Sequence, residues 1–280
     1  MATGGPRRGV RSTAWRFFEG GRRTCGRPVE EPSMVNEHVA IRTEDGVCGT
    51  HVVAPDGAGP WPAVILYMDA GGIRPALVDM AGRLATGGYL VLLPDLFYRY
   101  GPYGPFVPAD VFKGDFRAIL GPLMATTDNL KAATDTAALL AYLDTRDDVA
   151  GRAVGAVGFC MGGRMAITAA GTYPDRFAAV ASFHGGNLAT EEPASPHHLA
   201  PALRAEMYIA AAENDGSYPS AMAERLETAL SRAAVRYAAE TYPAAHGWMM
   251  PDFPVHDRAA AERGWAAMGA LFDRALRSTG

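Results

Sequence analysis

The chain has 280 residues, of which 49% are hydrophobic and 20% are charged, and its formal net charge is -4. This composition is apolar enough to fill a large core and excludes a disordered chain, and the acidic balance argues against nucleic acid as a partner. No apolar run reaches the roughly 18 to 20 residues that cross a membrane, so we expect no membrane partner and a cytoplasmic location.

The three cysteines are Cys25, Cys48 and Cys160, and this odd, low count does not suit a disulfide framework. None of them lies in a CxxC or CxH pair, so we expect no metal site. The sequence has no phosphate loop and no dinucleotide fingerprint, so we also expect no cofactor. A reducing compartment fits this cysteine usage.

The first 33 residues differ from the rest, because seven arginines and three glutamates fall there among frequent glycine and proline. No amphipathic period persists in this stretch, which predicts a disordered Arg-rich arm over 1–33 and one folded domain over 34–280. A natural start at Met34 is the alternative interpretation.

Strands alternate with helices from residue 35 onward. In chain order, the expected elements are strands at 35–42, 47–54 and 63–68, a helix at 75–86, a strand at 89–93, a helix at 125–143, a strand at 153–157, a helix at 161–172, strands at 177–183 and 206–211, a helix at 219–231, a strand at 235–242 and a helix at 255–277. The first two strands flank a hairpin signal, and the Gly- and Pro-rich stretch 97–124 has room for one short helix.

This alternation predicts an α/β fold, with a mostly parallel central sheet and helices on both faces. In such sheets, ligands bind beyond the carboxyl ends of the strands. Chemistry is therefore expected in the residues that directly follow each apolar run.

The most informative motif is the Gly-x-Cys-x-Gly string around Cys160, which lies between a predicted strand and a predicted helix. That context is the one that the nucleophile elbow of an α/β-hydrolase fold requires, with Gly158 and Gly162 allowing close backbone packing. The start of the helix favours a thiolate and a developing oxyanion, and the Met161 amide is a natural oxyanion donor. A buried structural cysteine in a glycine-rich turn is the alternative.

An acid and a base follow in the chain order that this fold requires, nucleophile, acid and then histidine. Asp215 lies after the strand at 206–211, and His246 lies after the strand at 235–242. His246 would act as the general base and Asp215 would fix its tautomer. Glu213 is a weaker candidate for the acid. His184, which also follows a strand, is the main rival base and a candidate pocket residue.

These residues together resemble the dienelactone hydrolase family. The resemblance rests on Gly158-Phe159-Cys160-Met161-Gly162-Gly163, on the Asp215 loop and on Ala245-His246-Gly247, and it extends from about Met34 to the C-terminal helix. Most α/β-hydrolases carry serine where this chain has Cys160, so the cysteine elbow is fairly specific.

The resemblance also implies roles for two residues after the strand at 63–68. Family members place a carboxylate, usually Glu, where this chain has Asp69, and that carboxylate contacts and activates the resting cysteine. The next amide, that of Ala70, would be the second oxyanion donor. A loop or helix-capping role is the alternative for Asp69.

For substrate binding, the resemblance implies that Arg99 grips a substrate carboxylate. A second family arginine, four residues after the catalytic histidine, is replaced here by Met250, which puts dienelactone itself in doubt. Aromatic side chains suggest a more apolar pocket, and the candidates are Tyr98, Tyr100, Tyr103, Phe106 and Trp248.

The sequence thus predicts a hydrolase that cleaves a small ester or lactone with a Cys-His-Asp triad, as a monomer or homodimer. One alternative is a binding or redox-sensing protein in which Cys160 responds to oxidation. Another is an acyltransferase or peptidase that uses the same triad.

Overall fold

The computed structural model describes residues 34–277, and the predicted arm at 1–33 lies outside them. The eight strands are β1 (Met34–Thr43), β2 (Gly46–Pro55), β3 (Trp61–Tyr67), β4 (Leu90–Pro94), β5 (Val149–Phe159), β6 (Phe177–Phe183), β7 (Glu206–Ala212) and β8 (Tyr237–Tyr242). They form one sheet in the order β1-β2-β4-β3-β5-β6-β7-β8. β1, β2 and β4 pair antiparallel, whereas β4, β3 and the strands from β5 to β8 are parallel. The predicted mostly parallel α/β sheet is confirmed.

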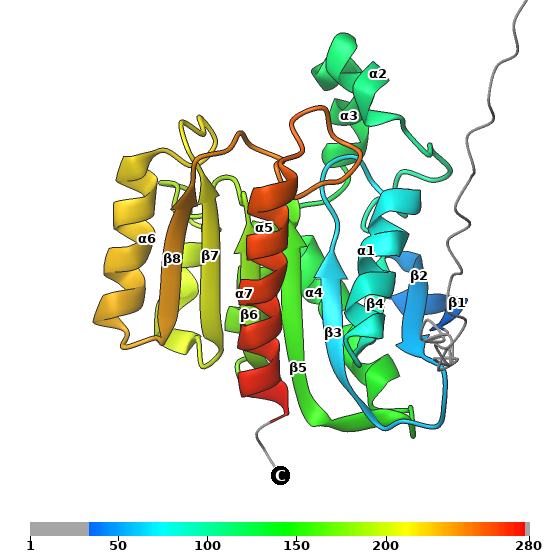
Figure 1. Cartoon of the computed structure of the whole chain (residues 1–280). Coiled ribbons are helices and arrows are strands. Elements are labelled where there is room, and N and C mark those ends of the chain that lie inside the picture. The colour runs from blue at the N-terminus through cyan, green and yellow to red at the C-terminus, as the bar shows by residue number, and fades with distance from the viewer. Residues whose placement is uncertain (1–33, 278–280) are drawn as a thin grey trace, which may run out of the picture. The chain divides into compact units, whose positions relative to one another are not determined.

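Helices cover both faces of this sheet (Figure 1). They are α1 (Pro75–Thr86), α2 (Pro108–Lys113), α3 (Phe116–Met124), α4 (Asn129–Leu143), α5 (Met161–Thr172), the 3-10 helix η1 (Pro196–Ala202), α6 (Ser220–Arg232) and α7 (Arg258–Leu276). α1 and α7 share one face, where Arg83 pairs with Glu262, and α4 packs against α5 on the other face. No helix within 34–277 combines the length and apolarity needed to cross a bilayer.

The central strands form the core because both of their faces are covered. Residues 63–67 of β3 and 90–93 of β4 are fully buried, as continuous apolar runs of a parallel sheet should be. The elbow strand β5 pairs with β3 on one side and with β6 on the other. The nucleophile position therefore follows a strand in the interior of the sheet, paired on both sides.

The Gly- and Pro-rich stretch holds two helices, α2 and α3, rather than the single short one expected. Asp115 caps α3 by accepting hydrogen bonds from the amides of Arg117 and Ala118. Asp128 likewise caps α4, which is why α4 starts at Asn129 and not at Ala125. Figure 1 shows α2 and α3 beyond the carboxyl-end edge of the sheet, on the side where the loop after β8 lies.

Candidate active site

Cys160 lies on the sharp turn that joins β5 to α5, with φ 54° and ψ -117°. L-residues rarely adopt this conformation, so the surrounding structure must hold it. A Cβ at Gly158 would overlap the backbone of Gly162, and a Cβ at Gly162 would overlap the backbone of Tyr67. The two glycines are therefore required for the close packing of the elbow, as the sequence predicted.

His246 and Asp215 come together across two neighbouring loops after β8 and β7. Nδ1 of His246 donates to Oδ2 of Asp215 at 2.6 Å, and the ring interacts with the side chain of Cys160. Both the amide and the hydroxyl of Ser217 donate to Oδ1 of Asp215, at 2.8 and 2.6 Å. Both carboxylate oxygens of Asp215 therefore accept hydrogen bonds. The sequence did not indicate that Ser217 supports Asp215 in this way.

The ionisation of these two groups follows from their contacts. Burial alone lowers the pKa of His246, but its hydrogen bonds to Asp215 and Cys160 outweigh burial and raise the pKa to about 10. Burial alone raises the pKa of Asp215, but the hydrogen bonds from His246 and Ser217 outweigh it and lower the pKa to about 2. An imidazolium between a thiol and a carboxylate is therefore stable at neutral pH.

A cavity of about 390 Å³ opens beside these groups, and Cys160, His246, Asp69 and Ala70 lie in its wall. Met161 begins α5 directly after Cys160, so its amide has no acceptor within the helix. This position suits an oxyanion donor. Asp215 pairs with His246 and the weaker candidate Glu213 is exposed to solvent.

Asp69 lines the cavity, but its carboxylate is engaged elsewhere than at the thiol. Oδ1 accepts from Gly71 N at 2.8 Å and from Arg74 Nη1 at 2.7 Å, and Oδ2 accepts from Arg74 Nη2 at 2.8 Å. Arg74 also donates through Nε and Nη2 to Asp252. The carboxylate of Asp69 is therefore held in a buried ion pair with Arg74, and its thiol-activating role stays a prediction.

Arg74 was missed by the sequence reasoning, although it lies only five residues after Asp69. Burial lowers the pKa of Arg74, but the hydrogen bonds to Asp69 and Asp252 outweigh it, so the net pKa is raised and the guanidinium stays charged. It ties the loop that carries Ala70 to the loop that follows His246. Because Asp69 and Asp252 are far apart in sequence, no local pattern could reveal this link.

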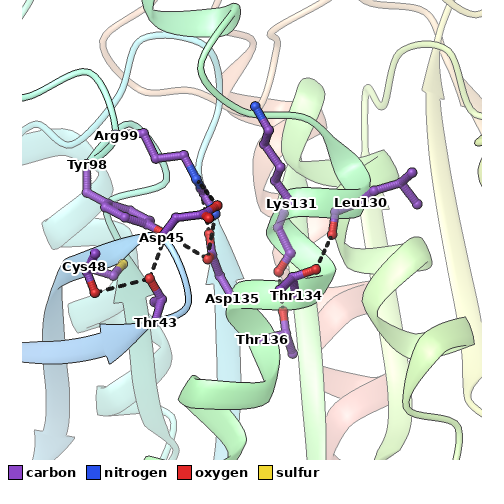
Figure 2. Close-up of polar contacts among 12 residues, drawn as sticks. Thr43, Asp45, Cys48, Tyr98, Arg99, Leu130, Lys131, Thr134, Asp135 and Thr136 are labelled. Atoms are coloured by element: carbon purple, nitrogen blue, oxygen red, sulfur yellow. Dashed lines mark hydrogen bonds and ion pairs between the residues drawn. The ribbon is translucent and has the colours of Figure 1, made fainter.

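Arg99 and Tyr98 lie outside the cavity wall, which corrects the expectation that they bind substrate there. Figure 2 shows their side chains directed at Asp135 of α4. Arg99 donates to both oxygens of Asp135 at 2.9 and 2.8 Å and to Asp45 at 2.7 Å, while the Tyr98 hydroxyl donates to Asp135 at 2.8 Å. This ion pair joins the β1–β2 turn, the loop after β4 and α4, so its role is structural.

His184 and Trp248 are also placed behind the cavity rather than in its wall. The His184 ring is fully buried 5.2 Å from the His246 ring, and neither ring nitrogen has a hydrogen-bond partner among the described residues. Burial, reinforced by His246, lowers the pKa of His184 well below its usual value, so it packs as a neutral ring. Trp248 stacks on Tyr242 at 4.3 Å and is fully buried.

Half of the twelve described residues in the cavity wall are ones that the sequence did not single out. They belong to α2, to α3 and to the loop after β8, and they are Pro108, Val111, Phe112, Phe116, Leu120 and Phe253, beside the expected Phe106. The aromatic content of the stretch 97–124 was the available signal. Among residues 34–277, no group of three or more His, Cys, Asp and Glu side chains is arranged to hold a metal ion.

Comparison with known proteins supports this architecture. The model of the dienelactone hydrolase family matches residues 48–276. A putative carboxymethylenebutenolidase of Synechocystis sp. is 26% identical over 247 residues, which is 85% of this chain and 96% of that protein. One from Escherichia coli (strain K12) is 27% identical over 227 residues, covering 80% and 81% of the two chains.

Among solved structures, a putative dienelactone hydrolase from Klebsiella pneumoniae superposes with a TM-score of 0.77. The two chains are 23% identical, and the match covers 86% of this chain and 99% of that one. This similarity shows the fold, an α/β-hydrolase fold. Because the family model spans most of the sequence, the chain belongs to the dienelactone hydrolase family.

Proposed function

We propose that this hydrolase cleaves an ester or lactone with Cys160 as nucleophile, His246 as acid and base, and Asp215 as the carboxylate that orients His246. The observation that carries the proposal is the bridging position of His246. Its Nδ1 lies 2.6 Å from Asp215, and its ring interacts with Cys160, which lines the same cavity. Covalent catalysis by a triad requires a nucleophile in contact with a base, and an acid that orients this base.

In the first half of the reaction, the Cys160 sulfur attacks the substrate carbonyl carbon and the thiol proton resides on His246. The Met161 and Ala70 amides donate to the oxyanion, which is where such donors lower the barrier. The tetrahedral adduct then collapses, the carbon–oxygen bond breaks, and His246 gives its proton to the departing oxygen. A thioester on Cys160 remains.

In the second half, His246 takes a proton from water, and the resulting hydroxide adds to the thioester carbonyl. Collapse of this adduct breaks the carbon–sulfur bond and releases the carboxylic acid, and the thiolate is again paired with the imidazolium. For a lactone, the alcohol and the acid are the two ends of one ring-opened product. Asp215 remains ionised throughout because its hydrogen bonds from His246 and from the amide and hydroxyl of Ser217 persist.

The decisive experiment is Cys160→Ala, assayed with p-nitrophenyl acetate. We expect hydrolysis to fall by at least about 10³-fold, while circular dichroism stays unchanged. Cys48→Ala is the matched control and should keep its activity, because Cys48 is buried in β2. Retention of activity in Cys160→Ala would remove the nucleophile and with it the proposal.

The same experiment separates the competing roles. Rapid-quench mass spectrometry of the wild type should show a transient acyl adduct on Cys160, whereas a redox-sensing protein would form none. Adding an alcohol or amine acceptor should leave the free acid as the main product. Transfer of most acyl groups to the acceptor would instead identify an acyltransferase.

A further inference from the structure

The wall of the cavity beside Cys160 is almost entirely apolar. Seven of its side chains are aromatic or aliphatic, and they are Phe106, Pro108, Val111, Phe112, Phe116, Leu120 and Phe253. The only ionisable side chains among the described residues that line it are those of Cys160, His246 and Asp69. A substrate group in this space is therefore transferred from water to a hydrocarbon environment.

Among residues 34–277, the only cation in the wall is the His246 imidazolium, whose charge is already paired with Asp215, so none is left for a negatively charged substrate. Arg74 lies nearby, but its three nitrogens donate to Asp69 and Asp252. Arg99 is held by Asp135 and Asp45 away from the cavity. Met250, at the fourth position after His246, is fully buried. A substrate carboxylate would therefore be desolvated without a partner, which is costly.

The apolar surface continues from the cavity to the outside of the molecule. Phe112 of α2 and Phe116 of α3 line the cavity and yet remain 49% and 38% exposed, and Val255 on the loop after β8 is 40% exposed. The Phe112 ring packs edge-on against Phe253 at 5.1 Å. Large aromatic side chains left exposed in one contiguous patch commonly mark a binding surface.

We propose that this site selects uncharged, apolar esters or lactones with a medium-length alkyl or aryl acyl group, and that Phe112, Phe116 and Phe253 determine this specificity. The inference rests on the proposed function, because the acyl group would be bound to Cys160 in the thioester. Phe253 closes the space from the loop of His246, and Phe112 and Phe116 close it from α2 and α3. The acyl chain lies along these rings toward the mouth.

The test is a series of p-nitrophenyl esters from acetate to octanoate, together with the p-nitrophenyl monoester of adipic acid. From acetate to hexanoate, we expect kcat/KM to rise about threefold for each added methylene. The adipate monoester, which carries a carboxylate at the end of a six-carbon chain, should be at least roughly 100-fold poorer than hexanoate.

Three variants locate the effect. Phe112→Ala and Phe253→Ala should flatten the chain-length profile, whereas Phe116→Arg should narrow the difference between adipate and hexanoate at least about tenfold. Leu130→Ala is the matched control, since Leu130 is also an exposed large apolar side chain, at 54%, but lies outside this cavity. Its profile should equal that of the wild type.

Each outcome decides one point. A flat chain-length profile in the wild type, or equal rates for adipate and hexanoate, would overturn the specificity inference while Cys160-dependent turnover of acetate leaves the proposed function intact. An unchanged profile in Phe112→Ala, Phe253→Ala and Phe116→Arg would refute the three rings as determinants. Absence of Cys160-dependent turnover with every ester would instead refute the proposed function itself.

Discussion

The two cysteines within the described residues lie in opposite chemical environments. Cys160 lies at the carboxyl end of β5, where it is partly accessible and interacts with the ring of His246. Cys48 is fully buried in β2, where its sulfur donates to the Asp95 carbonyl at 3.5 Å. Burial raises the pKa of Cys48 to about 12, and the negative charges of Asp135 and Asp95 reinforce the shift.

The comparison shows that position in the sheet, rather than residue type, decides what a thiol can do here. The parallel strands deliver their following loops to one edge, and three of these loops supply a thiol, an imidazole and a carboxylate. On the antiparallel side of the sheet, charged loop residues instead form ion pairs that hold neighbouring elements together. Figure 2 shows Asp45 and Arg99 converging with Asp135 beside Cys48 in a cluster that links three elements.

The largest effect should come from Asp215→Asn, which removes the charge that supports His246. We expect kcat/KM for an activated ester to fall by roughly 10⁴-fold, since an amide favours the wrong imidazole tautomer. Ser217→Ala, which removes only one hydrogen bond to Asp215, should lose far less. If kcat/KM fell by less than tenfold in Asp215→Asn, catalysis at Cys160 would not depend on the carboxylate of Asp215.

The second effect is a difference in alkylation between the two thiols. With a pKa of about 12, Cys48 should react with iodoacetamide at neutral pH at least about a thousandfold more slowly than an ordinary exposed thiol. Cys160 should be modified rapidly and activity should be lost in parallel. Peptide mass spectrometry over time measures both rates, and urea should make them converge. Equal alkylation rates of Cys48 and Cys160 in the native protein would contradict the expected difference between the two thiols.

The third effect concerns the structural cluster. Asp135→Asn leaves Arg99, only 10% exposed, without its main partner, and should lower the free energy of unfolding by about 3 to 5 kcal/mol. Glu262→Gln breaks the exposed pair with Arg83 and should lower the free energy of unfolding far less, because solvent screens this pair. Urea unfolding measures both. The specific activity of folded Asp135→Asn should be unchanged. A loss of activity without a loss of stability would instead indicate that Arg99 acts in the active site.

A fourth effect is the pH dependence of stability from His246. Its pKa in the folded protein, about 10, exceeds that of an unfolded chain, so its stabilisation is fully present below about pH 6.5 and is lost as the pH rises through about 10. The stability difference between wild type and Asp215→Asn should therefore shrink across this window. A difference that stays constant from pH 6.5 to 10 would contradict the pairing.

Local patterns in the sequence predicted much of this molecule. The helix at 75–86, the helix at 161–172 and the strand at 177–183 have the same bounds in the structure. The order of Cys160, Asp215 and His246 was also readable, because each follows a buried strand and all parallel strands end at one edge. Hydrophobic periodicity and the placement of glycines are short-range signals. The bounds of these elements and the order of these three residues can be read from such signals.

The partners of charged groups were decided only by the tertiary structure. Asp69 was expected at the thiol but pairs with Arg74, which also holds Asp252 far along the chain. Arg99 was expected to bind substrate but is held by Asp135. A side chain's charge and position in a loop do not specify which of several opposite charges it meets, because that depends on how distant elements pack.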